Sequence, residues 1–154
     1  NPSMEGGSME QQKLISKLAE IIDDSNAGIL CTSDKNGKTH VRWMTPILIR
    51  GRKGVIYSVT SQNSRKVDQI LQNSDVTWMI QTSSLDQVIT IHGKTNVLEN
   101  PSIKSELLET VGNKLTMFWR INEDLNEFVV LETVIEKAAY FVPMKGVFNT
   151  VHFS

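Results

Sequence analysis

Six short segments rich in β-branched and aromatic residues limit what this chain can fold into. In chain order they are AGILCTS (27–33), THVRWMTPILIR (39–50), VIYSV (55–59), DVTWMIQTS (75–83), QVITIHGKTNVLE (87–99) and EFVVLETVIEKAAYFVP (127–143). Most are separated by short turn sequences such as DKNGK and GRKG, and strands joined by tight turns pair antiparallel. We therefore predict a mainly β (α+β) fold, with a six-stranded antiparallel barrel that is closed or partly closed.

Segments with helical periodicity flank these strands. Apolar residues recur at helical spacing from Met9 to Asp24, and a second helix is predicted over Asn63–Gln72. A third is predicted over residues 100–112, with a short helical piece at 115–120. We expect the helices to plug the ends of the barrel or cover its edges.

The composition indicates one globular domain. We treat residues 1–8 as a disordered leader or a cloning remnant and residues 9–154 as a single domain. The net charge of −1 and the pI near 6.3 argue against a nucleic-acid partner. No segment is apolar for long enough to span a membrane, and the one cysteine fits a reducing compartment, so we expect a cytoplasmic protein.

The predicted second helix begins with two cations. Asn63 is the expected N-cap, which places Lys66 at the third helical position, where a capping box has Glu or Gln. Arg65 and Lys66 oppose the helix dipole by about 0.3–1 kcal/mol each. With free backbone N–H groups and the hydroxyls of Thr60 and Ser64, these cations would form a phosphate cradle, but a solvated helix start explains them equally well.

Arg42 interrupts an otherwise largely apolar strand. It either points to solvent or faces the same pocket, where a guanidinium would make a second, bidentate phosphate contact.

No arrangement of residues typical of a catalytic or metal site is visible. His40, His92 and His152 lie far apart in the sequence without metal-ligand spacing, and Cys31 lies among apolar neighbours, as a buried, inert cysteine does. We predict no metal site and assign no catalytic residue. An enzyme built on this chain would therefore depend on a cofactor for its chemistry.

The segment from Val41 to Pro101 resembles the FMN-binding split-barrel family related to pyridoxamine 5′-phosphate oxidase, and especially its small members of the general stress protein 26 type. The resemblance extends over about Leu14 to Phe141. It rests on the order of an arginine-led strand, a hydroxyl-rich loop into SRK, then NSDV and DQVITIHGK.

The resemblance implies a six-stranded split barrel that forms a homodimer with FMN at the subunit interface. It implies that Arg42 and the pair Arg65 and Lys66 bind the FMN phosphate. The full set of cofactor-binding residues that it implies is Arg42, Trp43, Met44, Thr45, Val59, Thr60, Arg65, Lys66, Gln87 and Trp119.

Two departures weaken the case for vitamin B6 oxidation. The oxidases themselves end with an arginine–histidine substrate motif that is missing here, and Asp86 stands where they carry a basic residue. We therefore expect an FMN-binding, oxidoreductase-like protein that acts on an unidentified substrate. A non-enzymatic, stress-related flavin sensor or store is the first alternative, and pyridoxamine 5′-phosphate oxidation is the second.

Overall fold

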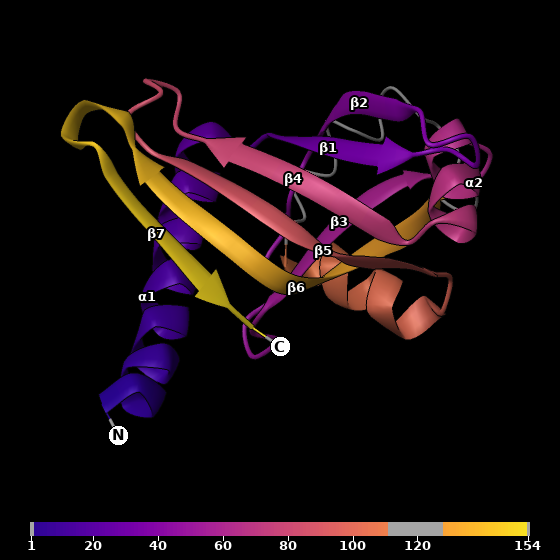
Figure 1. Cartoon of the computed structure of the whole chain (residues 1–154). Helices are drawn as coiled ribbons and strands as arrows, with labels where there is room; N and C mark the ends of the chain where they lie inside the picture. Colours follow the sequence, from indigo (N-terminus) through magenta and orange to yellow (C-terminus); the bar gives the residue numbers. More distant parts are fainter. Residues whose placement is uncertain (1, 111–127, 154) are drawn as a thin grey trace.

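The computed structural model describes residues 2–110 and 128–153 (Figure 1). In chain order its elements are α1 (Pro2–Ser25), β1 (Gly28–Ser33), β2 (Thr39–Met44), β3 (Val55–Ser61), α2 (Arg65–Gln72), β4 (Asp75–Gln81), β5 (Val88–Leu98), a helix over residues 101–110, β6 (Phe128–Val142), the 3-10 helix η2 (Pro143–Lys145) and β7 (Val147–His152). The predicted fold class is confirmed: the chain is mainly β, with an antiparallel split barrel and flanking helices.

The seven strands of the described residues belong to one antiparallel sheet. Its hydrogen-bonded order is β2-β1-β4-β5-β6-β3, and β7 pairs with the second half of β6. The sheet is not closed, because β2 and β3 stand at the two ends of this order. An isolated bridge beyond β2 links Ile47 to Tyr57 of β3, with N–O distances of 2.7 and 2.8 Å. The split of the barrel therefore lies between β2 and β3.

The sheet has one strand more than the predicted six. The additional strand is β7, which pairs antiparallel with β6 from Val147–Val142 to His152–Lys137. Four of its six residues are β-branched or aromatic, Val147, Phe148, Thr150 and Val151, but they do not alternate with polar residues, and the segment was not predicted as a strand. The strand forms because it pairs with β6, and the sequence of the tail alone does not show that pairing.

The helices begin at positions other than those predicted. Helix α1 starts at Pro2, inside the stretch expected to be a disordered leader. Helix α2 starts at Arg65, with Ser64 instead of Asn63 as its N-cap, because the Ser64 N–H bonds back to the Ser61 carbonyl in a turn (3.2 Å). The predicted helix end at Gly112 and the piece at 115–120 lie outside the described residues. No helix in the described part of the chain is long and apolar enough to cross a membrane.

The main core lies between α1 and the inner face of the sheet. Leu18 and Ile21 of α1 are fully buried there, together with Trp78 of β4. The Trp78 indole N–H donates to the hydroxyl of Thr133 (3.1 Å), which also lies 2.8 Å from the hydroxyl of Thr95. The buried polar groups of Trp78, Thr95 and Thr133 are thus paired with one another, as a stable interior requires.

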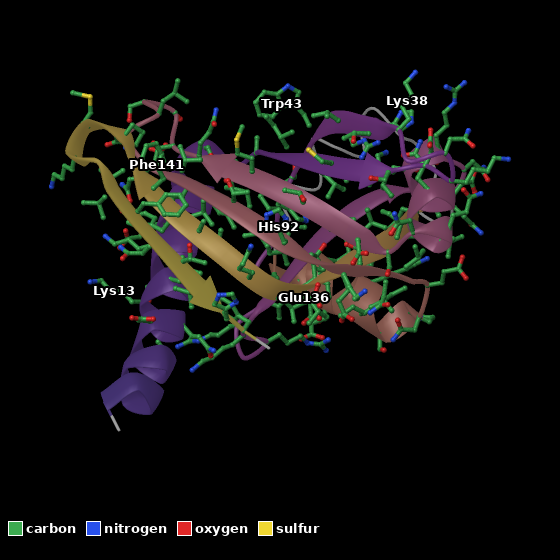
Figure 2. All side chains as sticks on the ribbon, in the orientation of Figure 1. Lys13, Lys38, Trp43, His92, Glu136 and Phe141 are labelled. Atoms are coloured by element: carbon green, nitrogen blue, oxygen red, sulfur yellow. The ribbon has the colours of Figure 1, made fainter. Side chains whose placement is uncertain are left out.

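Part of the outer face of the sheet has no helix over it in the described part of the chain, while the helix over residues 101–110 packs against Val59 of β3 and Val130 of β6 on another part. The strand register places Trp43 of β2, Phe141 of β6 and Phe148 of β7 on this face. Trp43 and Phe148 are 67% and 63% exposed, and Figure 2 shows the labelled side chains of Trp43 and Phe141 projecting from the strands. Large apolar groups exposed on one face of a sheet are typical of an interaction surface.

A β-bulge bends β6 where it crosses β5. His92 pairs with Lys137 and Gly93 with Ile135, which leaves Glu136 as the extra residue. A Cβ atom at Gly93 would collide with the carbonyl oxygen of Val134, so this close approach requires glycine.

We predict that Gly93→Ala lowers the free energy of unfolding by about 1–3 kcal/mol, the usual cost of overpacking a closely packed position. The matched control is Asn96→Ala, an exposed position on the same strand, with an expected change within about 0.5 kcal/mol. Chemical denaturation measures both, and equal effects would contradict this role of Gly93.

Candidate functional site

Two cations from distant parts of the sequence meet at the split of the barrel. Side chains alternate along β2, so Arg42 points inward while its neighbours Val41 and Trp43 are exposed. Its guanidinium donates to the Leu30 carbonyl (3.2 Å) and to Oε1 of Gln69 (3.3 Å). From the first turn of α2, the Lys66 ammonium donates to the hydroxyl of Thr60 on β3 (2.8 Å).

The cap of α2 adds unused hydrogen-bonding capacity beside Lys66. Ser64 has extended backbone angles, and its side chain makes no capping hydrogen bond. Its hydroxyl is buried without a partner among the described residues. The first N–H groups of a helix also lack partners within the helix. Hydroxyl, backbone N–H groups and the ammonium of Lys66 thus occupy the first turn of the helix, which is the arrangement that favours an anion.

The charges of Arg42 and Lys66 are not balanced. Within residues 2–110 and 128–153, neither side chain forms an ion pair with a carboxylate. Burial lowers the pKa of Lys66, and the nearby positive charge of Arg42 lowers it further. Burial likewise lowers the pKa of Arg42. Two partly desolvated cations near each other are unfavourable unless an anion joins them.

Gln69 and Thr32 belong to this site but were not predicted from the sequence. Oε1 of Gln69 accepts a hydrogen bond from the Thr32 hydroxyl (2.7 Å) as well as one from Arg42 (3.3 Å). Both residues are buried. The available signal was a glutamine one turn after Lys66, on the face of α2 that also buries Val67 and Ile70. The alternation of β1 could not reveal Thr32, since threonine is common at buried strand positions.

The other predicted residues of this segment lie around the cations in different ways. Arg65 is exposed, so only Lys66 of the cationic pair points into the split. The side chain of Val59 is buried in the smaller core beneath the helix at residues 101–110, which leaves only its backbone available to a ligand. Met44 packs against the main core, and Thr45 is exposed just after β2.

The predicted ring-contacting residues lie away from the two cations. Trp43 lines an outer-face pocket of about 270 Å³ together with Met79 and Leu85. Gln87 lies beyond the same end of β4, where its Oε1 accepts a hydrogen bond from the Tyr140 hydroxyl (2.9 Å). Trp119 lies outside the described residues. Of the predicted residues, the structure therefore brings Arg42, Lys66 and Thr60 together within one chain and leaves Trp43 and Gln87 apart from them.

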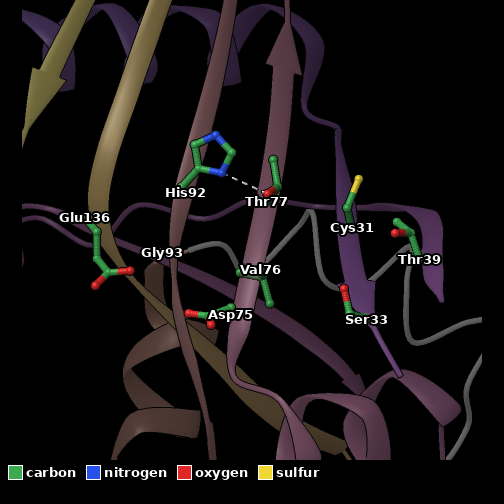
Figure 3. A pocket seen from close by; sticks show the side chains of 9 residues that line it. All are labelled: Cys31, Ser33, Thr39, Asp75, Val76, Thr77, His92, Gly93 and Glu136. Atoms are coloured by element: carbon green, nitrogen blue, oxygen red, sulfur yellow. Dashed lines mark hydrogen bonds between the residues drawn. The ribbon is translucent and has the colours of Figure 1, made fainter. Parts of the chain in front are cut away.

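A polar pocket of about 320 Å³ lies on the outer face across β1, β4, β5 and β6 (Figure 3). His92 and Thr77 are in contact through Nδ1 and Oγ1 (3.0 Å), and Glu136 approaches from the bulge. Cys31, expected to be buried, is only half-buried and lines this pocket. The described residues contain no group of three or more side chains placed to bind a metal ion.

Comparison with solved structures shows the same fold in proteins of several functions. A Clostridium acetobutylicum protein related to general stress protein 26 of B. subtilis has a TM-score of 0.72 and 17% identity, over 92% of this chain and 95% of its own. A pyridoxamine 5′-phosphate oxidase-related, FMN binding protein from Nostoc punctiforme PCC 73102 has a TM-score of 0.65 and 11% identity, over 90% and 95%. A heme binding protein from Mycobacterium smegmatis has a TM-score of 0.66 and 16% identity, over 86% and 55%.

Sequence comparison shows the family. No curated protein matches the sequence significantly. A family model described as pyridoxamine 5′-phosphate oxidase like matches residues 13–152, nearly the whole chain, as the predicted resemblance requires. The chain belongs to the pyridoxamine 5′-phosphate oxidase-like family.

Proposed function

We propose that this protein binds FMN and uses it for hydride or electron transfer on a small-molecule substrate. The observation that carries the proposal is the pair Arg42 and Lys66, partly buried at the split without a carboxylate partner among the described residues. A phosphate monoester supplies the missing negative charge and several acceptor oxygens. The FMN binding protein with the same fold supports the choice of this phosphate ligand.

The chain provides a distinct group for each part of the phosphate. Arg42 offers a planar guanidinium for bidentate contact, and Lys66 offers a point charge. The Ser64 hydroxyl and the N–H groups of the first turn of α2 supply further donors. Bound FMN would supply the redox chemistry, while these residues anchor and orient it.

We place the flavin ring along β2. This strand stands at one end of the sheet order, so one row of its backbone groups has no strand partner among the described residues and can meet a ligand. Trp43 and Met44 follow Arg42 on the same strand, and Trp43 lines the outer-face pocket. Arg65, Thr45 and the backbone of Val59 remain candidates for secondary contacts.

We further propose a homodimer that packs through the outer face of the sheet, with FMN at the interface. This face exposes Trp43, Phe141 and Phe148. A second copy packed on this face would allow Trp43 to contact the flavin of its neighbour. Gln87 does not contact Arg42 or Lys66 within one chain, and it remains a candidate for contact with the flavin across the dimer. The region of Trp119 is a further candidate for ring contact.

A second candidate function is that of a non-enzymatic flavin sensor or store. It is favoured by the absence of any acid or base among the described residues that contact Arg42 or Lys66. Reduction of the bound flavin by NADH or NADPH at a useful rate supports the enzyme, and no reduction supports the store. Oxidation of pyridoxamine 5′-phosphate would support the third function. The single cysteine supports a cytoplasmic location for each of them.

We predict that the wild-type protein binds FMN more tightly than riboflavin, because only FMN carries the phosphate. Lys66→Gln should weaken FMN binding about tenfold or more and leave riboflavin binding unchanged. Quenching of flavin fluorescence measures both affinities. Lys53→Gln, at an exposed turn, is the matched control and should change neither. Equal affinities of the wild-type protein for FMN and riboflavin would refute the phosphate site.

The lowered pKa of Lys66 also predicts a pH dependence of stability without ligand. Its folded-state pKa lies below the unfolded value near 10.5, so the unfolded chain binds more protons between these two values. The destabilisation is complete below the folded-state pKa and disappears as the pH rises toward 10.5. Lys66→Gln should therefore be more stable than the wild type near pH 7, with a difference that narrows at alkaline pH. Thermal denaturation across this range tests it, and a constant difference would exclude Lys66 as the cause.

The dimer proposal predicts a solution mass of about twice the 17.3 kDa of one chain. Trp43→Lys should reduce that mass to one chain, because it places a charge in the apolar interface. Leu71→Lys, at an exposed apolar residue of α2, is the control and should stay dimeric. Light scattering after gel filtration gives the mass, and a monomeric wild type in the presence of FMN would disprove the interface.

A further inference from the structure

We infer that Gln69 is a positioning residue for the phosphate site: its neutral amide orients the guanidinium of Arg42 without balancing its charge. This inference rests on the proposed FMN function and adds a residue that determines its anion specificity. The Gln69 side chain is neutral, so it acts on the ligand only through Arg42.

The position of the Gln69 amide is fixed from two sides. It is 9% exposed, and its Oε1 lies 2.7 Å from the Thr32 hydroxyl and 3.3 Å from a guanidinium nitrogen of Arg42. An arginine can only donate, so the oxygen end of the amide must face Arg42. Thr32 is itself 1% exposed on β1 and has little freedom to move. The amide oxygen is therefore a fixed acceptor for Arg42.

This acceptor and one backbone group hold Arg42 while leaving it free to bind. The second acceptor is the carbonyl oxygen of Leu30, the residue directly opposite Arg42 in the β1–β2 pairing. These two contacts are made by one NH1 and one NH2 donor, and a guanidinium has five N–H donors in all. The remaining donors are oriented before any ligand arrives, which reduces the entropy lost on binding.

The neutrality of Gln69 matters because of the helix that carries it. Gln69 follows Lys66 by three positions on α2, so both side chains emerge on the same side of the helix. A carboxylate at position 69 would lie against Arg42 and close to Lys66, and would balance their charge from within the protein. A glutamine keeps the same shape and the same acceptor but leaves the two cations in need of an external anion.

The test compares Gln69→Glu with the wild type, measuring the affinity for FMN and for riboflavin. We expect Gln69→Glu to bind FMN about tenfold or more weakly, to bind riboflavin as the wild type does, and to unfold at a higher temperature without ligand. The control Gln72→Glu adds the same charge at an exposed position of the same helix and should change none of these quantities. Only a role in anion recognition separates FMN from riboflavin in this way, since damage to the fold would affect both.

A second variant covers the case in which Gln69→Glu fails to fold. Thr32→Val removes the hydroxyl that fixes the amide and should weaken FMN binding by about threefold or more, again without an effect on riboflavin. FMN affinity unchanged in Gln69→Glu, or reduced in parallel with riboflavin affinity, would overturn the role of Gln69. A wild type that does not prefer FMN over riboflavin would instead overturn the proposed function, so the two failures are distinct.

Discussion

Repulsion between Arg42 and Lys66 is the constraint on which this account of the molecule depends. The two cations come from β2 and from α2, are partly buried, and have no carboxylate partner in the described part of the chain. Such a pair lowers the stability of the protein alone and becomes favourable when an anion occupies the site. Under the proposed function, this loss of stability is offset when the phosphate of the ligand binds between the two cations.

The open barrel is what allows this pair to form. Because the sheet does not close, the end strands β2 and β3 present Arg42 and Thr60 to the same space, and α2 follows β3 directly and brings Lys66 there. The core between α1 and the sheet holds these strands in place, with Trp78 fixed by its bond to Thr133. The same fold leaves the part of the outer face around Trp43, Phe141 and Phe148 uncovered within the described residues, and the proposed dimer would use that part.

The sequence predicted the features that local chemistry determines. Strand segments, the turn at Asn36–Gly37 and the unusual charges of Arg65 and Lys66 follow from residue types at short range, and the family resemblance linked Arg42 to them. Contacts that depend on strand pairing and on the direction of side chains could not be predicted from the sequence. The seventh strand depends on β6, the N-cap moved to Ser64 through a backbone turn, and Gln69 showed its role only when α2 packed against β1 and β2. For the same reason the sequence could not separate Lys66, which points into the split, from Arg65, which is exposed.

The most direct test of the central claim is a crystal structure of the protein grown with FMN. We expect density for the phosphate at the split, within hydrogen-bonding distance of Arg42, Lys66 and the Ser64 hydroxyl, with Gln69 still hydrogen-bonded to Arg42. A flavin bound with its phosphate elsewhere, while Arg42 and Lys66 remain without an anion, would contradict it.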